Sequence, residues 1–154
     1  MAPDQRLGKI HLKRNSLIIE RFGKDGQPSG KRTRWTIKMM SNLPREMFFK
    51  IVGFLQHGIK RYGTGSMDDM TMAATKALGQ AGEAFGCEVG DRKKQADLYW
   101  LLDGRRFIAW QIHEARVDER RVRKLTRSKA PLRVVVVIKK GGYFEIKPQS
   151  TRHD

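Results

Sequence analysis

The sequence predicts an α/β (α+β) fold in which helices flank a mixed β-sheet. Between residues 66 and 147, hydrophobic residues recur first at helical spacing and then in strand-like runs, in the order α-β-β-β-α-β-β. Strands that alternate with helices favour a mixed sheet with helices on its faces. One run, residues 132–138 (LRVVVVI), is rich in β-branched residues, as is typical of a strand buried on both faces. We therefore expect a main domain over 66–147, after an N-terminal part over 1–65 and before a polar tail over 148–154.

The N-terminal part is predicted to contain a basic β-hairpin. Residues 17–22 (LIIERF) have the composition of a strand, and residues 34–39 (RWTIKM) alternate polar and apolar side chains. Residues 23–30 (GKDGQPSG), between them, are rich in Gly, Pro and Ser, as is typical of a turn. Because a hairpin alone is only marginally stable in water, we expect another element to cover its apolar face.

A helix is predicted from Pro44 to about Tyr62, because apolar side chains recur there at spacings of three and four residues. Glu46 in its first turn and Lys60 in its last turn suit the helix dipole. Residues 63–65 (GTG) are predicted to end it. We expect this helix to cover the hairpin.

A second helix is predicted from Ser66 to about Phe85. Ser66 and Asp69 have the spacing of a capping box, with Asp in place of the usual Glu. Small and apolar residues then gather on one side, which permits close packing against a sheet. These residues are Met70, Ala73, Ala74, Ala77, Leu78 and Ala81.

Three strands are expected to follow as a meander. Residues 87–89 form a short run, residues 96–102 (ADLYWLL) a longer apolar one, and residues 106–113 (RFIAWQIH) the return strand. Asp103–Gly104, between the last two, is a strong hairpin signal.

A short, very basic helix is predicted over 117–128 (VDERRVRKLTRS), before the buried strand. Val122 and Leu125 are three positions apart and can anchor it, which leaves most of its basic side chains pointing outward. Gly141–Gly142 then predicts a turn into a last strand over 143–146.

Charge indicates the class of partner. The 154 residues carry 32 Lys and Arg against 16 Asp and Glu, for a formal net charge of +16. A chain this basic repels itself unless an anionic partner is near, and Lys and Arg contacts to nucleic acid gain affinity by counterion release. Nucleic acid, either DNA or RNA, is therefore the expected partner. The alternatives are an anionic membrane surface and a basic protein without a special partner. Since no run of about 18 apolar residues is present, no transmembrane segment is expected.

The single cysteine, Cys87, excludes an internal disulfide and, with four scattered histidines, a zinc-finger pattern. It fits a reducing compartment. We therefore expect an intracellular protein (cytoplasmic, nucleoid or nuclear) or one within a virion, and a homo-oligomer is compatible with the sequence.

Residues 82–115 (GEAFGCEVGDRKKQADLYWLLDGRRFIAWQIHEA), followed by the basic helix and by residues 132–138, resemble the core of the PD-(D/E)XK (restriction-endonuclease-like) nuclease superfamily. That superfamily includes many restriction enzymes, junction resolvases and some viral endonucleases. Its core consists of a helix, a three-stranded meander, a second helix and another strand. The resemblance covers about half of this chain.

The resemblance implies a phosphodiester-cleaving site with Mg²⁺ or Mn²⁺ as cofactor. The superfamily's first acid begins the second meander strand, where this chain has Asp97. Its second motif, an acid and a Lys or a variant separated by one residue, falls on Gln111 and His113, so that Gln replaces the acid and His the Lys. Glu83 corresponds to an extra helix acid of some members. Mg²⁺ prefers anionic oxygen ligands, whereas Gln111 offers only a neutral carbonyl, so the nearby Glu114 is a candidate substitute.

Strand register decides which of these side chains meet. A two-residue Asp103–Gly104 loop pairs Asp97 with Trp110 and places its side chain on the face of Glu114. A three-residue loop pairs Asp97 with Gln111, on the face of His113. A bulge changes either answer, and both alternatives stay open.

Each candidate also has a simpler interpretation. Asp97 can be a solvated turn residue, Gln111 a hydrogen-bonded interior amide and His113 a structural histidine. A shared fold does not by itself give a shared function.

Basic side chains beyond the cleavage motif are candidates for phosphate contacts, and Trp35 can either stack on an unpaired base or lie in the core. The candidates are Lys31, Arg32, Arg34 and Trp35 in the hairpin, Arg92, Lys93, Lys94, Arg105 and Arg106 in loops, and Arg120, Arg121, Arg123, Lys124 and Arg127 in the basic helix.

Two functions follow as hypotheses. The first is a nucleic-acid-binding protein with a nuclease-like core that is a metal-dependent endonuclease, in which Asp97, Gln111, His113 and Glu114 are catalytic and Asp97, Glu114 and Glu83 hold the metal. The second is a non-catalytic nucleic-acid-binding or packaging protein of the nucleoid, nucleocapsid or matrix type, which the substitutions at Gln111 and His113 favour. A peripheral membrane-binding protein is a third, weaker hypothesis.

Overall fold

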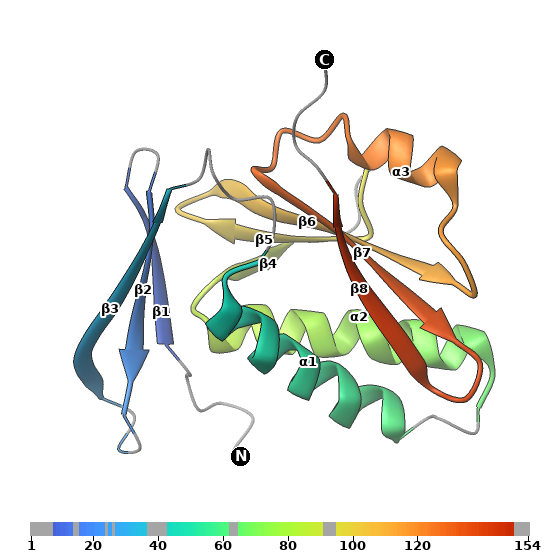
Figure 1. The fold of residues 1–154 in the computed structure, drawn as a ribbon, viewed down its shortest axis with the longest axis horizontal. Coiled ribbons are helices and arrows are strands. Elements are labelled where there is room, and N and C mark those ends of the chain that lie inside the picture. Colours follow the sequence, from blue (N-terminus) through green and yellow to red (C-terminus); the bar gives the residue numbers. More distant parts are fainter. Residues whose placement is uncertain are drawn as a thin grey trace.

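The computed structural model describes residues 8–13, 16–23, 25, 27–36, 43–61, 65–90 and 95–149, which contain two β-sheets and three helices (Figure 1). In chain order the elements are β1 (Gly8–Lys13), β2 (Ser16–Phe22), β3 (Pro28–Thr36), α1 (Arg45–Lys60), α2 (Met67–Ala84), β4 (Glu88–Gly90), β5 (Leu98–Leu102), β6 (Arg105–Glu114), α3 (Glu119–Leu125), β7 (Leu132–Lys139) and β8 (Tyr143–Gln149). One sheet has the spatial order β1-β2-β3 and the other the order β4-β5-β6-β7-β8.

The five-stranded sheet is mixed because one of its strand pairs is parallel. β4, β5 and β6 form an antiparallel meander, β7 runs parallel to β6, and β8 runs antiparallel to β7. The parallel pair requires a crossover connection, and that connection contains α3. α1 and α2 lie on one side of the sheet and α3 lies on the other (Figure 1). The predicted fold class is confirmed, because helices flank a mixed sheet.

Two groups of buried side chains hold the helices to this sheet. The larger group lies on the α1 and α2 side and includes Trp100 and Trp110, whose ring centroids are 5.1 Å apart. The smaller group lies on the α3 side and includes Tyr99 and Leu125. Residues 134–138 of β7 are all buried and alternate between the two groups. This confirms that the β-branched run forms a strand buried on both faces.

The predicted basic hairpin is present as β2 and β3. The N–H of Gly23 donates to the carbonyl of Gln27 at 2.8 Å within the turn. β3 begins at Pro28, inside the stretch predicted to be a turn, and residues 37–39 of the predicted return strand lie outside the described residues. β1, which pairs with β2 on the other side, has no counterpart in the prediction.

α1 packs chiefly along α2, which corrects the expectation that it covers the hairpin. Small residues allow the two helices to approach closely, since a Cβ added at Gly58 would lie 3.0 Å from the Cβ of Ala77. The apolar side of α1 therefore joins the larger core group. Its buried residues are Met47, Ile51, Leu55 and Ile59.

The start of α2 agrees with the prediction, whereas the extent of α3 differs from it. Ser66 caps α2 as predicted, because its hydroxyl accepts a hydrogen bond from the N–H of Asp69 at 3.2 Å. α3 is shorter than the predicted helix over 117–128. It begins after Asp118, its N-cap, and the chain tightens at its end, where the N–H of Ser128 donates to the carbonyl of Leu125.

Two further features concern the membrane and the C-terminus. No helix in the described part of the chain is long and apolar enough to cross a bilayer. β8 extends to Gln149, so it includes two residues that the sequence assigned to the polar tail.

Candidate functional site

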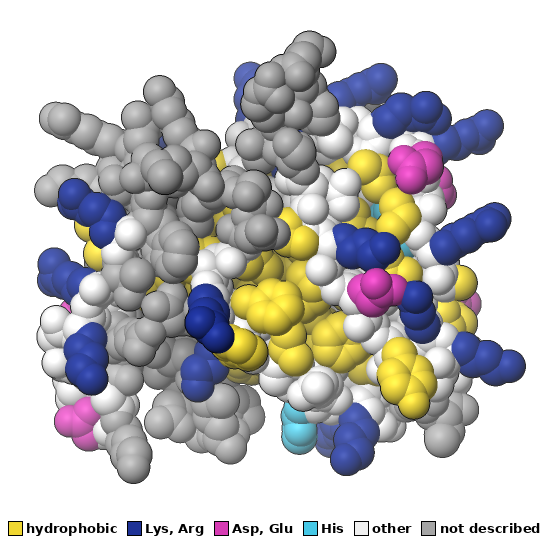
Figure 2. Space-filling model, viewed as in Figure 1, with side chains coloured by type: hydrophobic (Ala, Val, Ile, Leu, Met, Phe, Trp, Pro, Cys, Tyr) yellow, Lys and Arg dark blue, Asp and Glu magenta, His cyan; other side chains and the backbone are white. Residues whose placement is uncertain are grey.

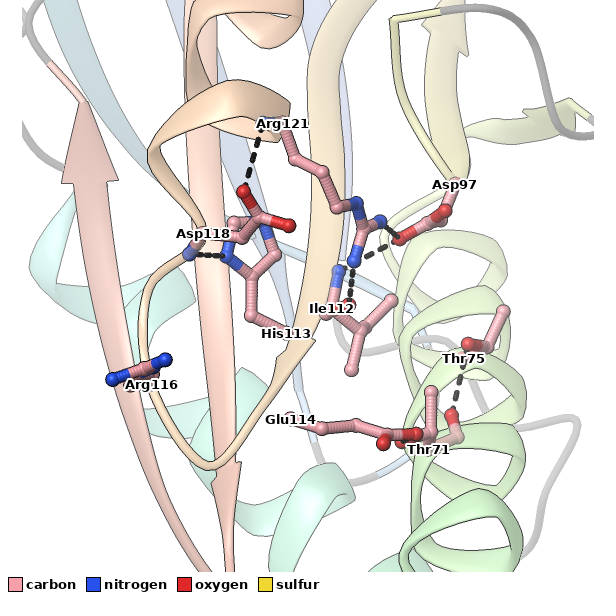
Figure 3. Close-up of a pocket in the computed structure, with 9 residues that line it drawn as sticks. All are labelled: Thr71, Thr75, Asp97, Ile112, His113, Glu114, Arg116, Asp118 and Arg121. Carbon is pink, nitrogen blue, oxygen red and sulfur yellow. Dashed lines mark hydrogen bonds and ion pairs between the residues drawn. The ribbon is translucent and has the colours of Figure 1, made fainter.

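A cleft of about 600 Å³ opens where the end of β6, the start of β5, the first half of α2 and the loop into α3 come together (Figure 3). Both candidate strand acids face it, as does the candidate histidine. The lining residues are Thr71, Thr75, Asp97, Ile112, His113, Glu114, Arg116, Asp118 and Arg121.

A β-bulge shifts the register between β5, which follows Asp97, and β6, which ends with His113 and Glu114. Asp103 and Gly104 form a two-residue turn, since Leu102 pairs with Arg105, and both turn residues have a positive φ. The register then shifts by one residue between Leu101 and Trp100. Each of the two predicted alternatives is therefore partly wrong, because the loop is the shorter one and the pairing beyond the bulge is that of the longer one.

The carboxylate of Asp97 is fixed by a hydrogen bond and an ion pair with other residues of the protein. Its Oδ2 accepts a hydrogen bond from the N–H of Ile112 at 2.9 Å and forms an ion pair with Nη2 of Arg121 at 2.5 Å. The other end nitrogen of Arg121, Nη1, donates to the carbonyl of Ile112 at 2.8 Å. The carboxylate, the guanidinium and the backbone N–H and C=O groups of Ile112 thus form a closed set of contacts, drawn as dashed lines in Figure 3.

The other acids of the predicted site differ from Asp97 in position. Glu114 is exposed on the opposite wall of the cleft, where its Oε1 accepts a hydrogen bond from the hydroxyl of Thr71 at 3.2 Å. Glu83 does not line the cleft. It lies twelve residues after Thr71 in α2, or roughly 18 Å along the helix axis at about 1.5 Å per residue.

Gln111 is 3% exposed and makes three hydrogen bonds. Its Nε2 donates to the carbonyls of Gln95 and Arg121, each at 2.8 Å, and its Oε1 lies 2.8 Å from Nε2 of His113. Two donated bonds and one accepted bond are what an amide supplies and a carboxylate cannot. The interpretation of Gln111 as a hydrogen-bonded interior amide matches this geometry.

His113 joins the cleft to the start of α3. Its Nδ1 accepts a hydrogen bond from the N–H of Asp118 at 2.9 Å, so the ring proton of the neutral form lies on Nε2 and is donated to Gln111. Burial, and then the charge of Arg121, lower the pKa of His113 below its usual value, against the opposite effects of Asp118 and Asp97. The ring is therefore neutral near pH 7 and both of its nitrogens are engaged.

The residues of this site do not fit a divalent metal. The described residues contain no group of three or more His, Cys, Asp and Glu side chains that could hold a metal ion. The Oδ2 atom of Asp97 already faces a guanidinium, and Gln111 and His113 direct their polar atoms toward other protein groups. The guanidinium of Arg121 thus lies beside Asp97, where a bound metal ion would be expected.

The predicted phosphate-contacting residues fall into three sets. Lys31, Arg32, Arg34, Arg105, Arg106, Arg120, Arg123, Lys124 and Arg127 are exposed. Arg121 is instead half-buried in the cleft, and Arg106 lies over the ring of Tyr99 at 4.4 Å. Trp35 is on β3, and Arg92, Lys93 and Lys94 lie outside the described residues.

Sequence reasoning missed five lining residues, Thr71, Thr75, Ile112, Arg116 and Asp118. Asp118 had a usable signal, because an Asp before a run of helix-forming residues is a common N-cap. The pairing of Arg121 with Asp97 had none, since the two residues are 24 positions apart.

No protein-family model, curated protein or solved structure matches this chain.

Proposed function

We propose that this protein binds nucleic acid through backbone phosphates, on the α3 side of a nuclease-like α/β core. The observation that carries the proposal is the density of exposed cations at α3. Five exposed cations fall within the ten residues from Arg120 to Lys129, and none of them forms an ion pair with a described residue. They are Arg120, Arg123, Lys124, Arg127 and Lys129.

We call these five residues, Arg120, Arg123, Lys124, Arg127 and Lys129, the α3 surface. A further cation, Arg116, borders it. Arg116 precedes α3 and is exposed at the mouth of the cleft. Figure 2 shows Lys and Arg side chains projecting from the edge of the molecule where Figure 1 places α3. In contrast, three of the exposed charged residues of α2, on the other side of the sheet, are the acids Asp68, Asp69 and Glu83.

Guanidinium and ammonium groups without ion-pair partners among the described residues suit phosphate contacts, because each contact releases condensed counterions from the nucleic acid. Such contacts position a protein on a strand without reading its bases. The expected binding is therefore strongly salt-dependent and weakly dependent on sequence.

The test compares two variants of equal net charge. The first replaces Arg120, Arg123 and Lys124 of α3 with Gln, a residue of similar helix propensity. The second replaces three exposed cations of α1, Arg45, Lys50 and Lys60, with Gln. Binding to fluorescein-labelled single-stranded and duplex DNA and RNA is measured by anisotropy in EDTA.

The α3 variant is expected to bind about tenfold or more weakly than wild type, since each phosphate contact contributes to binding, whereas the α1 variant changes less. An equal decrease in both variants would show that binding follows net charge and would overturn the assignment of the surface. Wild-type protein that leaves nucleic acid unbound but sediments with anionic liposomes would support membrane binding instead.

A metal-dependent endonuclease is the second candidate. It requires Arg121 to release Asp97 so that a metal can bind there, but one observation favours it. Asp97 and Glu114 line the same cleft, at the strand positions that the nuclease resemblance assigns to a cleavage site. Incubation of labelled DNA and RNA with Mg²⁺ or Mn²⁺, beside Asp97→Ala, distinguishes the two functions. Cleavage by wild type alone would establish the nuclease, and intact nucleic acid in every reaction is the outcome expected for a binding protein.

A further inference from the structure

α3 has little apolar anchorage for an element that carries so much charge. It is seven residues long, and isolated helices shorter than about 12–15 residues are marginal in water. Leu125 is its one fully buried residue, and Val122 is half-buried. Arg120 and Lys124, which are four residues apart, repel each other on its exposed side. Other contacts must therefore fix its orientation on the sheet.

Arg121 supplies one such set of contacts. Its guanidinium is bound to the carboxylate of Asp97 and to the carbonyl of Ile112, and its own carbonyl accepts a hydrogen bond from Gln111. The side chains of Arg121 and Asp97 are 35% and 21% exposed, so their ion pair is partly shielded from water. Charge-assisted bonds of this kind are stronger than neutral ones and hold a defined geometry.

His113 and Gln111 supply a second set at the first turn of α3. His113 accepts the N–H of Asp118, and Asp118 in turn accepts the N–H of Arg120 at 3.0 Å. Gln111 connects the same histidine to the carbonyl of Gln95, just before β5. The start of α3 is thereby tied to both β6 and the segment that carries Asp97.

We propose that Asp97, Gln111 and His113 are positioning residues, which hold α3 so that Arg120, Arg123 and Lys124 face the nucleic acid as a fixed set. The guanidinium of Arg121 supplies the positive charge beside Asp97 that a bound metal ion would supply in a cleavage site. The inference rests on the proposed function, in that it gives the residues of the departing nuclease motif a part in binding.

The charge of Asp97 makes this inference testable. An acid near a phosphate-binding surface repels phosphate, so its removal should strengthen binding if charge alone matters. If Asp97 positions α3, its removal should weaken binding. The two possibilities therefore lead to changes of opposite sign.

The experiment compares Asp97→Asn with Glu114→Gln, each of which removes one negative charge from the same cleft while preserving side-chain shape. Asp97 contacts α3, and Glu114 contacts Thr71 of α2. Affinity for a labelled duplex oligonucleotide is measured by anisotropy in EDTA. We expect Asp97→Asn to bind more weakly than wild type by about threefold to tenfold, and Glu114→Gln to bind equally or more tightly. Equal behaviour of the two variants would overturn the inference.

The salt dependence separates positioning from a general decrease in stability. Each phosphate contact contributes about 0.9 to the slope of log affinity against log salt concentration on duplex DNA. Displacement of α3 reduces this slope in Asp97→Asn at a temperature where the variant is fully folded. An unchanged slope in a folded variant would contradict the inference.

The involvement of Arg121 is tested in the Arg121→Gln background. Because Asp97 acts through Arg121, adding Asp97→Asn to Arg121→Gln should change affinity by less than about twofold. The same decrease in both backgrounds would show that Asp97 acts independently of Arg121 and would contradict the inference.

Amide hydrogen exchange over residues 119–125 distinguishes this inference from the proposed function, because it requires no nucleic acid. Faster exchange in Asp97→Asn than in Glu114→Gln is expected whether or not the protein binds nucleic acid. Equal exchange in the two variants would overturn the positioning role even if wild type binds tightly. Absence of binding by wild type would overturn the proposed function alone.

Discussion

The contacts of Gln111 and His113 suit an amide and an imidazole better than the acid and the Lys that a nuclease-type motif would require at these positions. The Nε2 of Gln111 faces two carbonyl oxygens at 2.8 Å, where a Glu at the same position would place an acceptor against acceptors. Nδ1 of His113 accepts the N–H of Asp118, and a Lys has no acceptor to offer. The residues that a cleavage site would require are therefore incompatible with the hydrogen bonds that hold α3.

At the same scale, the neutral state of His113 leads to a pH dependence of stability. Burial and the charge of Arg121 lower the pKa of His113 in the folded protein. As the pH falls below about 6.5, the unfolded chain therefore binds more protons than the folded protein does. Its contribution to the free energy of unfolding is present at neutral pH and disappears as the pH falls through the lowered pKa. Between about pH 7.5 and about pH 5, we expect the stability of His113→Gln in urea unfolding to fall less than that of wild type.

The control for this prediction is His57→Gln, which changes an exposed histidine of α1. This variant should keep the pH dependence of wild type. A His113→Gln protein whose stability falls with pH as steeply as that of wild type would contradict the assignment of the neutral ring.

The bulge opposite Trp100 marks the limit of sequence reasoning about single residues. Asp97, His113 and Glu114 were each identifiable by type and by place in the strand order. The face of the sheet that Asp97 shares with β6 was not, because it depends on a one-residue register shift between β5 and β6. The turn at Asp103–Gly104 has a strong sequence signal. The register shift between Trp100 and Leu101 has no such signal.

At the scale of elements, α2 illustrates how one glycine can be required and another replaceable. A Cβ at Gly82 would lie 2.8 Å from Nε1 of Trp100, a fully buried ring whose N–H donates to the carbonyl of Leu78 at 3.0 Å. A Cβ at Gly79 would meet nothing closer than the Cγ1 of Val89 at 3.7 Å.

Two substitutions in α2 should therefore have opposite effects on the free energy of unfolding. Gly79→Ala should stabilise the protein by about 0.5–1 kcal/mol, because Ala favours the helix. Gly82→Ala should destabilise it by about 1–3 kcal/mol, because Trp100 must move in a packed core. Urea unfolding of both variants provides the measurement. Stabilisation by Gly82→Ala would show that the Trp100 ring can shift without cost.

Element prediction succeeded where local signals and burial agreed. The cap at Ser66 and the small apolar face fixed α2, and the β-branched run fixed β7. Element prediction failed where the structure depends on which other element a segment packs against or pairs with. α1 has an apolar face that can cover any apolar surface, and its packing on α2 includes a close approach of Gly58 to Ala77 that the sequence pattern does not reveal. β1 is a six-residue segment whose sequence, GKIHLK, acquires its role by pairing with β2.

At the scale of the whole molecule, the larger group of core residues and the α3 surface lie on opposite sides of the five-stranded sheet (Figure 1). The large core group lies between the five-stranded sheet and the helices α1 and α2, while α3 covers the smaller group on the other side. A net charge of +16 on a chain of 154 residues destabilises the compact state by self-repulsion. An anionic partner relieves that repulsion, which is why composition predicts the partner class while the positions of the cations must come from the structure.

The most direct test of phosphate binding by the α3 surface is the salt dependence of duplex binding in EDTA, for wild type and for the variant with Gln at Arg120, Arg123 and Lys124. We expect log affinity to fall linearly with log salt concentration. The slope of the variant should be smaller by about 0.9 for each phosphate that its α3 no longer neutralises. Binding by wild type that does not change with salt, or an identical slope in the two proteins, would contradict this role of α3.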